Sequence, residues 1–184
     1  MRILGGRWRG ALLISPGAPV RPSREDLRAE LFLMFSNRLP DLEEASVLDL
    51  FAGTGSLGLE ALSRGAKSCD FIENGPAALH ALKANIAARR IPPLKRGVQP
   101  SKAHPAARLF KRDAIPFAAA LQERSYDIAF ADPPYRSLKL DRILEIWQQN
   151  HFAGCLLIEH PSELDLKGDR LLKIEDRAVT AFIL

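Results

Sequence analysis

Residues 47–62 have the sequence VLDLFAGTGSLGLEAL, and this stretch decides the fold. Its first half is a short apolar run and its second half has helical spacing, which predicts a buried strand, a glycine turn and the start of a helix. Gly53 and Gly55 allow a tight turn and the close approach of a ligand, and Gly58 allows the helix to pack closely on the strand. The stretch therefore predicts a nucleotide-binding turn.

Asp49 helps to decide which nucleotide this turn binds. The spacing Gly53-x-Gly55-x-x-Gly58 also fits dinucleotide-binding dehydrogenases, although alone it is a weak signal. A pyrophosphate at a helix N-terminus favours positive potential, which an aspartate at the end of the strand opposes. S-adenosylmethionine carries an ammonium group and no phosphate, so it suits this carboxylate. An NAD-dependent dehydrogenase is the alternative of a different class, and a turn that only packs the strand on the helix is the structural alternative.

Length and composition are those of one globular domain with a small N-terminal appendage. The chain has 184 residues, of which 47% are hydrophobic and 26% charged. No apolar run is long enough to span a bilayer and no signal peptide is evident, so we expect a cytoplasmic protein that does not contact a membrane. Cys69 and Cys155 lack the spacing of a metal site or a disulfide, so we expect buried thiols and no metal.

Strands and helices alternate along most of the chain. We expect strands at 46–51, 68–73, 107–111, 126–131, 155–159, 171–174 and 179–184. We expect helices at 56–64, 76–89, 117–122 and 138–150. An N-terminal β-hairpin, from apolar runs at 2–4 and 11–14, and a helix at 23–37 precede them. This order predicts an α/β fold with a mostly parallel seven-stranded sheet and a C-terminal antiparallel strand pair.

Acidic residues follow two of the expected strands, where an open α/β sheet binds its ligands. Glu73 ends the second strand, and its carboxylate can accept hydrogen bonds from a ribose diol. Asp113, followed by Ala114, lies at the tip of the third strand and can accept a hydrogen bond from an adenine ring. For Glu73, a solvated strand end is the structural alternative.

Asp132-Pro133-Pro134-Tyr135 follows the fourth strand. The prolines stiffen the chain and offer no N–H, so the Asp132 carboxylate and the Pro133 carbonyl are available as acceptors, and Tyr135 can stack on a base. Two acceptors aimed at the hydrogens of an exocyclic base amine direct its lone pair toward an electrophile. The tetrapeptide therefore predicts methyl transfer to an unpaired or flipped base, and a proline turn that only ends the strand is the structural alternative.

Basic residues gather in two segments that favour a polyanionic partner. Residues 1–24 contain five arginines and no acidic residue, and residues 83–112 contain nine basic residues and no acidic residue. Trp8 between two arginines suits unpaired nucleic acid, although it could instead attach the hairpin to the core. The predicted RNA-binding residues are Arg7, Trp8, Arg9, Arg21, Arg24 and Arg28, the last two on one helix face.

Several motifs resemble known methyltransferase families. Residues 49–58 resemble the first motif of class I S-adenosylmethionine-dependent methyltransferases, and residues 132–135 resemble the (Asp/Asn)-Pro-Pro-(Tyr/Phe/Trp) motif of those that modify base amino groups. That motif does not separate adenine N6, cytosine N4 and guanine N2. The bacterial family that methylates guanine N2 in 16S ribosomal RNA is similar over nearly the whole chain, at RILGGRWRG (2–10), Arg21-Pro22, Leu31-Phe32, LEALSRGA (59–66) and Glu159-His160.

This resemblance implies a Rossmann-like fold in which residues 1–40 contact RNA and residues 41–184 form the catalytic domain. It implies ribosomal RNA, within a partly assembled 30S subunit, as the partner. It implies that Asp132, Pro133 and Tyr135 are catalytic. It implies that S-adenosylmethionine contacts Asp49, Phe51, Gly53, Thr54, Gly55, Glu73, Asp113, Ala114 and Asp132. An adenine-N6 or cytosine-N4 methyltransferase of DNA or RNA, and an RNA-binding assembly factor without catalysis, remain alternatives.

Overall fold

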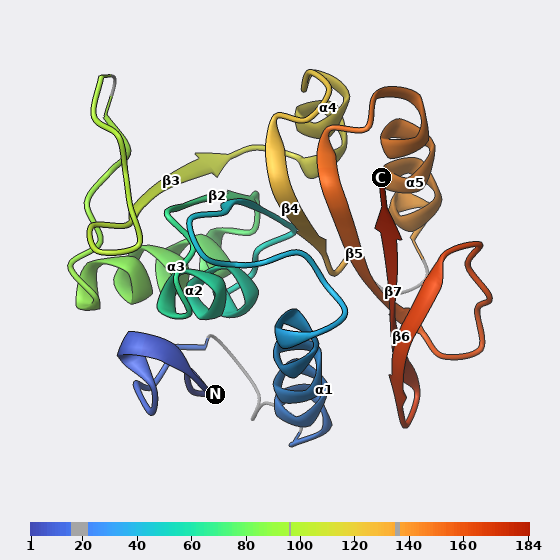
Figure 1. The fold of residues 1–184 in the computed structure, drawn as a ribbon, viewed down its shortest axis with the longest axis horizontal. Helices are drawn as coiled ribbons and strands as arrows, with labels where there is room; N and C mark the ends of the chain where they lie inside the picture. The colour runs from blue at the N-terminus through green and yellow to red at the C-terminus, as the bar shows by residue number, and fades with distance from the viewer. Residues whose placement is uncertain (16–21, 96, 135–136) are drawn as a thin grey trace.

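A seven-stranded sheet forms the centre of the computed structural model, which describes residues 1–15, 22–95, 97–134 and 137–184, with the backbone alone for 22–24 (Figure 1). Its strand order is β3-β2-β1-β4-β5-β7-β6. The strands are β1 (Ser46–Leu50), β2 (Ser68–Glu73), β3 (Ala106–Lys111), β4 (Tyr126–Ala131), β5 (Ala153–Pro161), β6 (Asp169–Ile174) and β7 (Arg177–Ile183). β1 to β5 are parallel, and β7 pairs antiparallel with β5 and β6. The predicted sheet is confirmed.

Helices cover both faces of the sheet. They are α1 (Pro22–Leu33), α2 (Ser56–Ser63), α3 (Pro76–Ala88), α4 (Ala114–Ala119) and α5 (Lys139–Asn150), with 3-10 turns η1 (Gly6–Trp8) and η2 (Met34–Ser36). Successive strand residues face opposite sides, so Val47 packs with α1, α2 and α3 while Leu48 packs with α4 and α5. None of the described helices is long and apolar enough to cross a membrane.

Two helices differ from the sequence prediction at their ends. α4 begins at Ala114 rather than 117, because the Asp113 carboxylate accepts a hydrogen bond from the Ile115 N–H at 2.9 Å and caps the helix. α1 ends at Leu33, and the η2 turn completes the segment that was predicted to be helical as far as residue 37. Both differences concern helix ends. The residue at which a helix begins or ends depends on local hydrogen bonds rather than on the periodicity of the sequence.

Residues 1–15, here called the N-terminal arm, form a looser hairpin than predicted. One antiparallel bridge joins Arg2 to Leu12, and η1 replaces a regular turn. The arm lies directly on α2: a Cβ at Gly6 would be 1.8 Å from the Ser63 carbonyl oxygen. Backbone hydrogen bonds still join its two halves, as from the Ile3 N–H to the Ala11 carbonyl at 2.9 Å, and the Leu4 N–H donates to the Glu60 carboxylate at 2.7 Å, so the main domain adds the support that a lone hairpin lacks.

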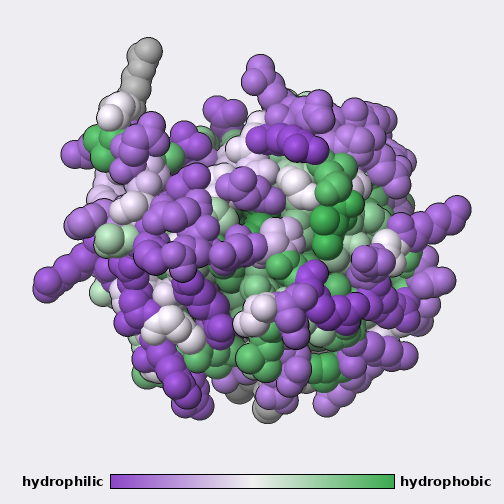
Figure 2. All heavy atoms as spheres, viewed as in Figure 1, coloured by the Kyte–Doolittle hydropathy of each residue, from purple (hydrophilic) through white to green (hydrophobic). Residues whose placement is uncertain are grey.

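The winding of the chain reverses between β1 and β4, and open α/β sheets bind ligands at the carboxyl edge beside such a point. Leu50 of β1 is in register with Ala131 of β4, which is in register with Ile158 of β5. The next residues, Phe51, Asp132 and Glu159, therefore lie side by side at this edge. On the face shown in Figure 2, hydrophilic residues dominate and hydrophobic ones gather around the region where Figure 1 draws β4 and β5.

Candidate active site

A pocket of about 230 Å³ lies at the carboxyl edge of the sheet, beside the point where the winding reverses. Its lining includes residues from the glycine loop, the end of β2, the segment after β4, α5 and β7. These residues are Phe51, Glu73, Asn74, Asp132, Pro133, Pro134, Lys139 and Arg177. The structure therefore brings together three of the predicted site segments: the glycine loop, Glu73 and the proline-containing tetrapeptide.

The two glycines of the loop have different roles. Gly53 and Gly55 have φ values of +56° and +81°, in the left-handed region that favours glycine. A Cβ at Gly55 would lie 2.4 Å from the Leu82 Cδ1, so packing also requires glycine there. At Gly53 the nearest atom to such a Cβ is the Phe51 carbonyl oxygen at 3.9 Å, which leaves space for a ligand. The Thr54 carbonyl accepts a hydrogen bond from the Asn85 side chain at 3.0 Å, which ties the loop to α3.

Glu73 joins the glycine loop to the end of β2. Its Oε2 accepts a hydrogen bond from the Gly53 N–H at 2.7 Å, and its Oε1 accepts from the N–H groups of Asn74 and Gly75 at 2.8 and 2.6 Å. A carboxylate has about four acceptor positions, so this arrangement leaves room for one more donor. Its contact with a ribose hydroxyl stays a prediction.

Asp49 lies beneath the loop and is not among the residues that line the pocket. Its carboxylate is 2% exposed and accepts a hydrogen bond from the Gly58 N–H at 2.9 Å. Burial raises the pKa of Asp49 to about 8, and the charges of Asp132 and Glu73 add to the effect while the Gly58 hydrogen bond opposes it. The geometry supports a role in fixing the turn, and direct contact with a cofactor ammonium stays a prediction.

Asp49→Asn is expected to stabilise the protein more at pH 8 than at pH 5. Because the folded pKa of about 8 lies above the ordinary 3.8, Asp49 contributes most stability below pH 4 and loses it as the pH rises toward 8. Asparagine keeps an acceptor for the Gly58 N–H and cannot ionise. The unfolding free energy of Asp49→Asn minus that of the wild type should be larger at pH 8 than at pH 5, by about 2 kcal/mol or more. Urea unfolding at both pH values checks this, and a gain independent of pH would contradict it.

Asp113 has partners that sequence reasoning did not foresee. Besides capping α4, it accepts a hydrogen bond from the Lys139 Nζ at 3.0 Å. The Ile115 N–H, and then Lys139, lower the pKa of the Asp113 carboxyl. Lys139 also lies 5.5 Å from the centre of the Phe51 ring. Ala114 is buried at the start of the helix, and the contact of this pair with adenine stays a prediction.

Asp132 lies beside a buried arginine that the sequence analysis did not identify. The Arg177 Nη2 is 3.6 Å from the Asp132 Oδ1, and the Arg177 Nε is 3.0 Å from the Glu159 Oε1. Arg177 comes from β7, whose pairing with β5 places it opposite Pro161. No motif marks this residue, since only the strand register brings it to the pocket. Tyr135 lies outside the described residues.

The predicted RNA-binding residues of the N-terminal arm have different surroundings. Trp8 is half-buried against the core, and its backbone N–H donates a hydrogen bond to the Ser63 Oγ at 3.0 Å, which favours the alternative that it attaches the arm. Arg7 is exposed; its guanidinium lies 5.6 Å from the Trp8 ring centre and donates a hydrogen bond to the Ala103 carbonyl. Arg9 is exposed. Contacts of these residues with RNA stay predictions.

The proposed phosphate-binding face of α1 is contradicted at Arg28. This side chain is 5% exposed and donates a hydrogen bond to the Arg2 carbonyl at 2.6 Å. It also lies 4.0 Å from the Glu60 carboxylate, which is fully buried. The helix turns Arg28 inward because its neighbour Glu60 supplies the balancing charge. Arg21 and the side chain of Arg24 lie outside the described residues.

Comparisons with known proteins agree over nearly the whole chain. The family described as Conserved hypothetical protein 95 matches residues 1–178. Ribosomal RNA small subunit methyltransferase D of Escherichia coli K12 is 36% identical over 167 residues, covering 90% of this chain and 76% of that protein. The solved structure of Escherichia coli yhhF matches with a TM-score of 0.76 and 29% identity over 98% of this chain and 96% of that chain. A hypothetical protein of Thermus thermophilus matches with a TM-score of 0.73 and 30% identity over 100% and 99%. The chain therefore belongs to the Conserved hypothetical protein 95 family, and its fold is that of the class I methyltransferases.

Proposed function

We propose that this protein is an S-adenosylmethionine-dependent methyltransferase that modifies the exocyclic N2 amine of a guanine in 16S ribosomal RNA. One observation carries the proposal: the glycine loop and Asp132-Pro133-Pro134 follow adjacent strands in register and line one pocket. The family supports ribosomal RNA as substrate, because its Escherichia coli relative is named as a small-subunit ribosomal RNA methyltransferase.

The residues of the pocket suit S-adenosylmethionine. Gly53 leaves open space above the loop, and the carboxylates of Glu73 and Asp132 line the pocket beside it. Carboxylates favour a ligand with ammonium and sulfonium charges over the pyrophosphate of a dinucleotide, and the two cations of the lining, Lys139 and Arg177, are each paired with an acidic residue. Glu73 would bind the ribose, and Asp113 and Ala114 the adenine. The cofactor, when bound, supplies an electrophilic methyl group.

The chain's own residues contribute positioning and hydrogen-bond acceptance. The Asp132 carboxylate and the Pro133 carbonyl would accept hydrogen bonds from the two hydrogens of the base amine, which directs the amine lone pair toward the cofactor. Pro133 and Pro134 have no N–H that could donate to that lone pair. An Asp132 oxygen would take up the proton that the amine loses as its bond to carbon forms. Stacking of Tyr135 on the base remains part of the proposal.

The target base must leave its stack before it can reach this pocket. The exposed Arg7 and Arg9 of the N-terminal arm, and the basic segment 83–112, would bind the flanking phosphates. This part of the proposal retains the predicted contact of residues 1–40 with RNA, apart from Arg28.

Labelled S-adenosylmethionine with unmethylated 30S particles tests the proposal. After digestion to nucleosides, we expect the label in N2-methylguanosine, and we expect faster transfer to partly assembled 30S particles than to naked 16S RNA. Label found only in adenosine or cytidine derivatives would contradict the proposal that guanine is the target base. Absence of transfer to every RNA by a protein that binds the cofactor would contradict the activity.

A further inference from the structure

The carboxylates of Asp132 and Glu159 hold one guanidinium group between them. The Arg177 Nη2 faces Asp132 at 3.6 Å, and the Nε of the same group faces Glu159 at 3.0 Å. The side chains of Arg177 and Glu159 are only 8% and 14% exposed, so solvent screens these charges weakly. Two nitrogens attached to one carbon thus form ion pairs with two separate carboxylates.

Asp132 and Glu159 lie side by side along the carboxyl edge of the sheet. Asp132 is next to the glycine loop, and Glu159 is one strand farther from it. Phe51, Asp132 and Glu159 follow in-register positions on β1, β4 and β5. The glycine loop therefore lies on one side of Asp132, and Glu159 lies on the other. A base whose amine contacts Asp132 while facing the glycine loop would extend its ring edge toward Glu159.

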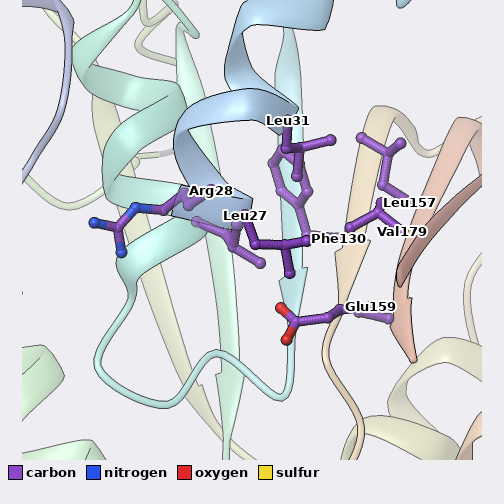
Figure 3. A pocket seen from close by; sticks show the side chains of 9 residues that line it. Leu27, Arg28, Leu31, Phe130, Leu157, Glu159 and Val179 are labelled. Carbon is purple, nitrogen blue, oxygen red and sulfur yellow. The ribbon is translucent and has the colours of Figure 1, made fainter. Parts of the chain in front are cut away.

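Glu159 also forms the polar end of an apolar pocket beneath α1 (Figure 3). In β5 it shares a face with Leu157, and Figure 3 shows its carboxylate directed toward Leu27 and Phe130. The pocket is lined by Leu27, Arg28, Leu31, Leu57, Phe130, Ala131, Leu157, Glu159 and Val179. The cavity is about 20 Å³, which is room for about one water and not for a base, so a base edge would have to reach the Glu159 carboxylate from the side of Asp132.

Guanine presents the same pair of donors as the arginine side chain. Its N2 amine and its N1–H are attached to one carbon, as are the Nη2 and Nε of a guanidinium. In adenine the N6 amine is next to the N1 acceptor, and in cytosine the N4 amine is next to the N3 acceptor. Those ring nitrogens would meet the lone pairs of the Glu159 carboxylate, and an unpaired acceptor facing another acceptor weakens binding.

We propose that Glu159 selects guanine by accepting a hydrogen bond from the guanine N1–H while Asp132 accepts one from the N2 amine. The base edge takes the place of the Arg177 guanidinium, which keeps the two carboxylates at this spacing when no base is bound. This inference rests on the proposed function, and it assigns base selection to a residue outside the proline-containing tetrapeptide.

2-Aminopurine provides the test, because it keeps the N2 amine but has an acceptor at N1 in place of the N1–H. After the methylated guanine is mapped, 16S RNA with 2-aminopurine at that position is prepared by ligation and assembled into 30S particles. Single-turnover rates are compared for the wild type, Glu159→Gln and the control Glu163→Gln, which changes an exposed glutamate nearby. The glutamine amide can donate a hydrogen bond to the N1 acceptor.

We expect the wild type and Glu163→Gln to prefer guanine at least a hundredfold. We expect Glu159→Gln to reduce this preference at least tenfold, with cofactor affinity unchanged. A wild type that methylates both bases equally would overturn the inference without any variant. A Glu159→Gln protein that binds the cofactor and keeps the full preference for guanine over 2-aminopurine would also overturn the inference. A wild type that methylates no guanine in any particle would instead overturn the proposed function.

Discussion

Asp132→Ala is expected to abolish detectable methyl transfer while the affinity for S-adenosylmethionine stays nearly unchanged. The carboxylate would accept a hydrogen bond from the base amine, so its loss removes an interaction made with the reacting atom. The loop at Gly53, with Glu73, would still hold the cofactor. Loss of one such positioned group lowers kcat by about 10² to 10³-fold, and more where it also receives a proton.

Single-turnover methylation and calorimetry measure the two quantities separately. Asp127→Ala is the matched control, because Asp127 lies near the start of β4, the strand that Asp132 follows, and accepts a hydrogen bond from the Ser46 N–H at 2.7 Å, away from the pocket. That variant should keep the wild-type rate per folded molecule. If cofactor affinity fell in parallel with the rate in Asp132→Ala, the assigned role of Asp132 would be wrong.

The second large effect concerns stability, through the buried carboxylate of Glu60. This side chain is 0% exposed and accepts hydrogen bonds from the Leu4 N–H and the Arg64 Nε, both at 2.7 Å. The guanidinium of the buried Arg28 lies 4.0 Å away. Glu60 therefore joins the N-terminal arm, α1 and α2 through one group.

Glu60→Ala should lower the free energy of unfolding by about 3 to 5 kcal/mol, because it leaves Arg28 buried without its counter-charge and the Leu4 N–H without its acceptor. Urea unfolding measures the change, and limited proteolysis shows whether the arm detaches. Glu30→Ala, on the exposed side of α1, should change the free energy by less than about 0.5 kcal/mol. Equal losses in the two variants would show that the buried carboxylate has no special role.

The sequence was sufficient to predict the sheet because the central strands β1, β4 and β5 are mostly apolar and a glycine or proline follows β1 and β4 closely. The alternation of such runs with helical spacing predicts parallel strands, and the antiparallel β6 and β7 follow without a helix between them. The position of the pocket was predictable for the same reason. Gly53 and Asp132 both follow strands, and parallel strands bring their carboxyl ends to one edge.

The sequence was insufficient where a side chain's role depends on its partner. Arg28 looked like a surface phosphate ligand, but Glu60 of α2 draws it inward. Asp113 was assigned to adenine, yet it also caps α4 and pairs with Lys139. Arg177 carries no motif, and it reaches Asp132 only because β7 pairs with β5. Such contacts depend on helix phase and strand register, which local patterns do not determine.

The central claim is that the cofactor binds against the glycine loop with its sulfur facing Asp132. The structure of a cocrystal with S-adenosylhomocysteine tests it most directly. The account predicts the sulfur beside Asp132 and Pro133, the ribose at Glu73, and the adenine near Asp113 and Ala114. A ligand bound on another side of the sheet, or one whose sulfur points away from Asp132, would contradict it.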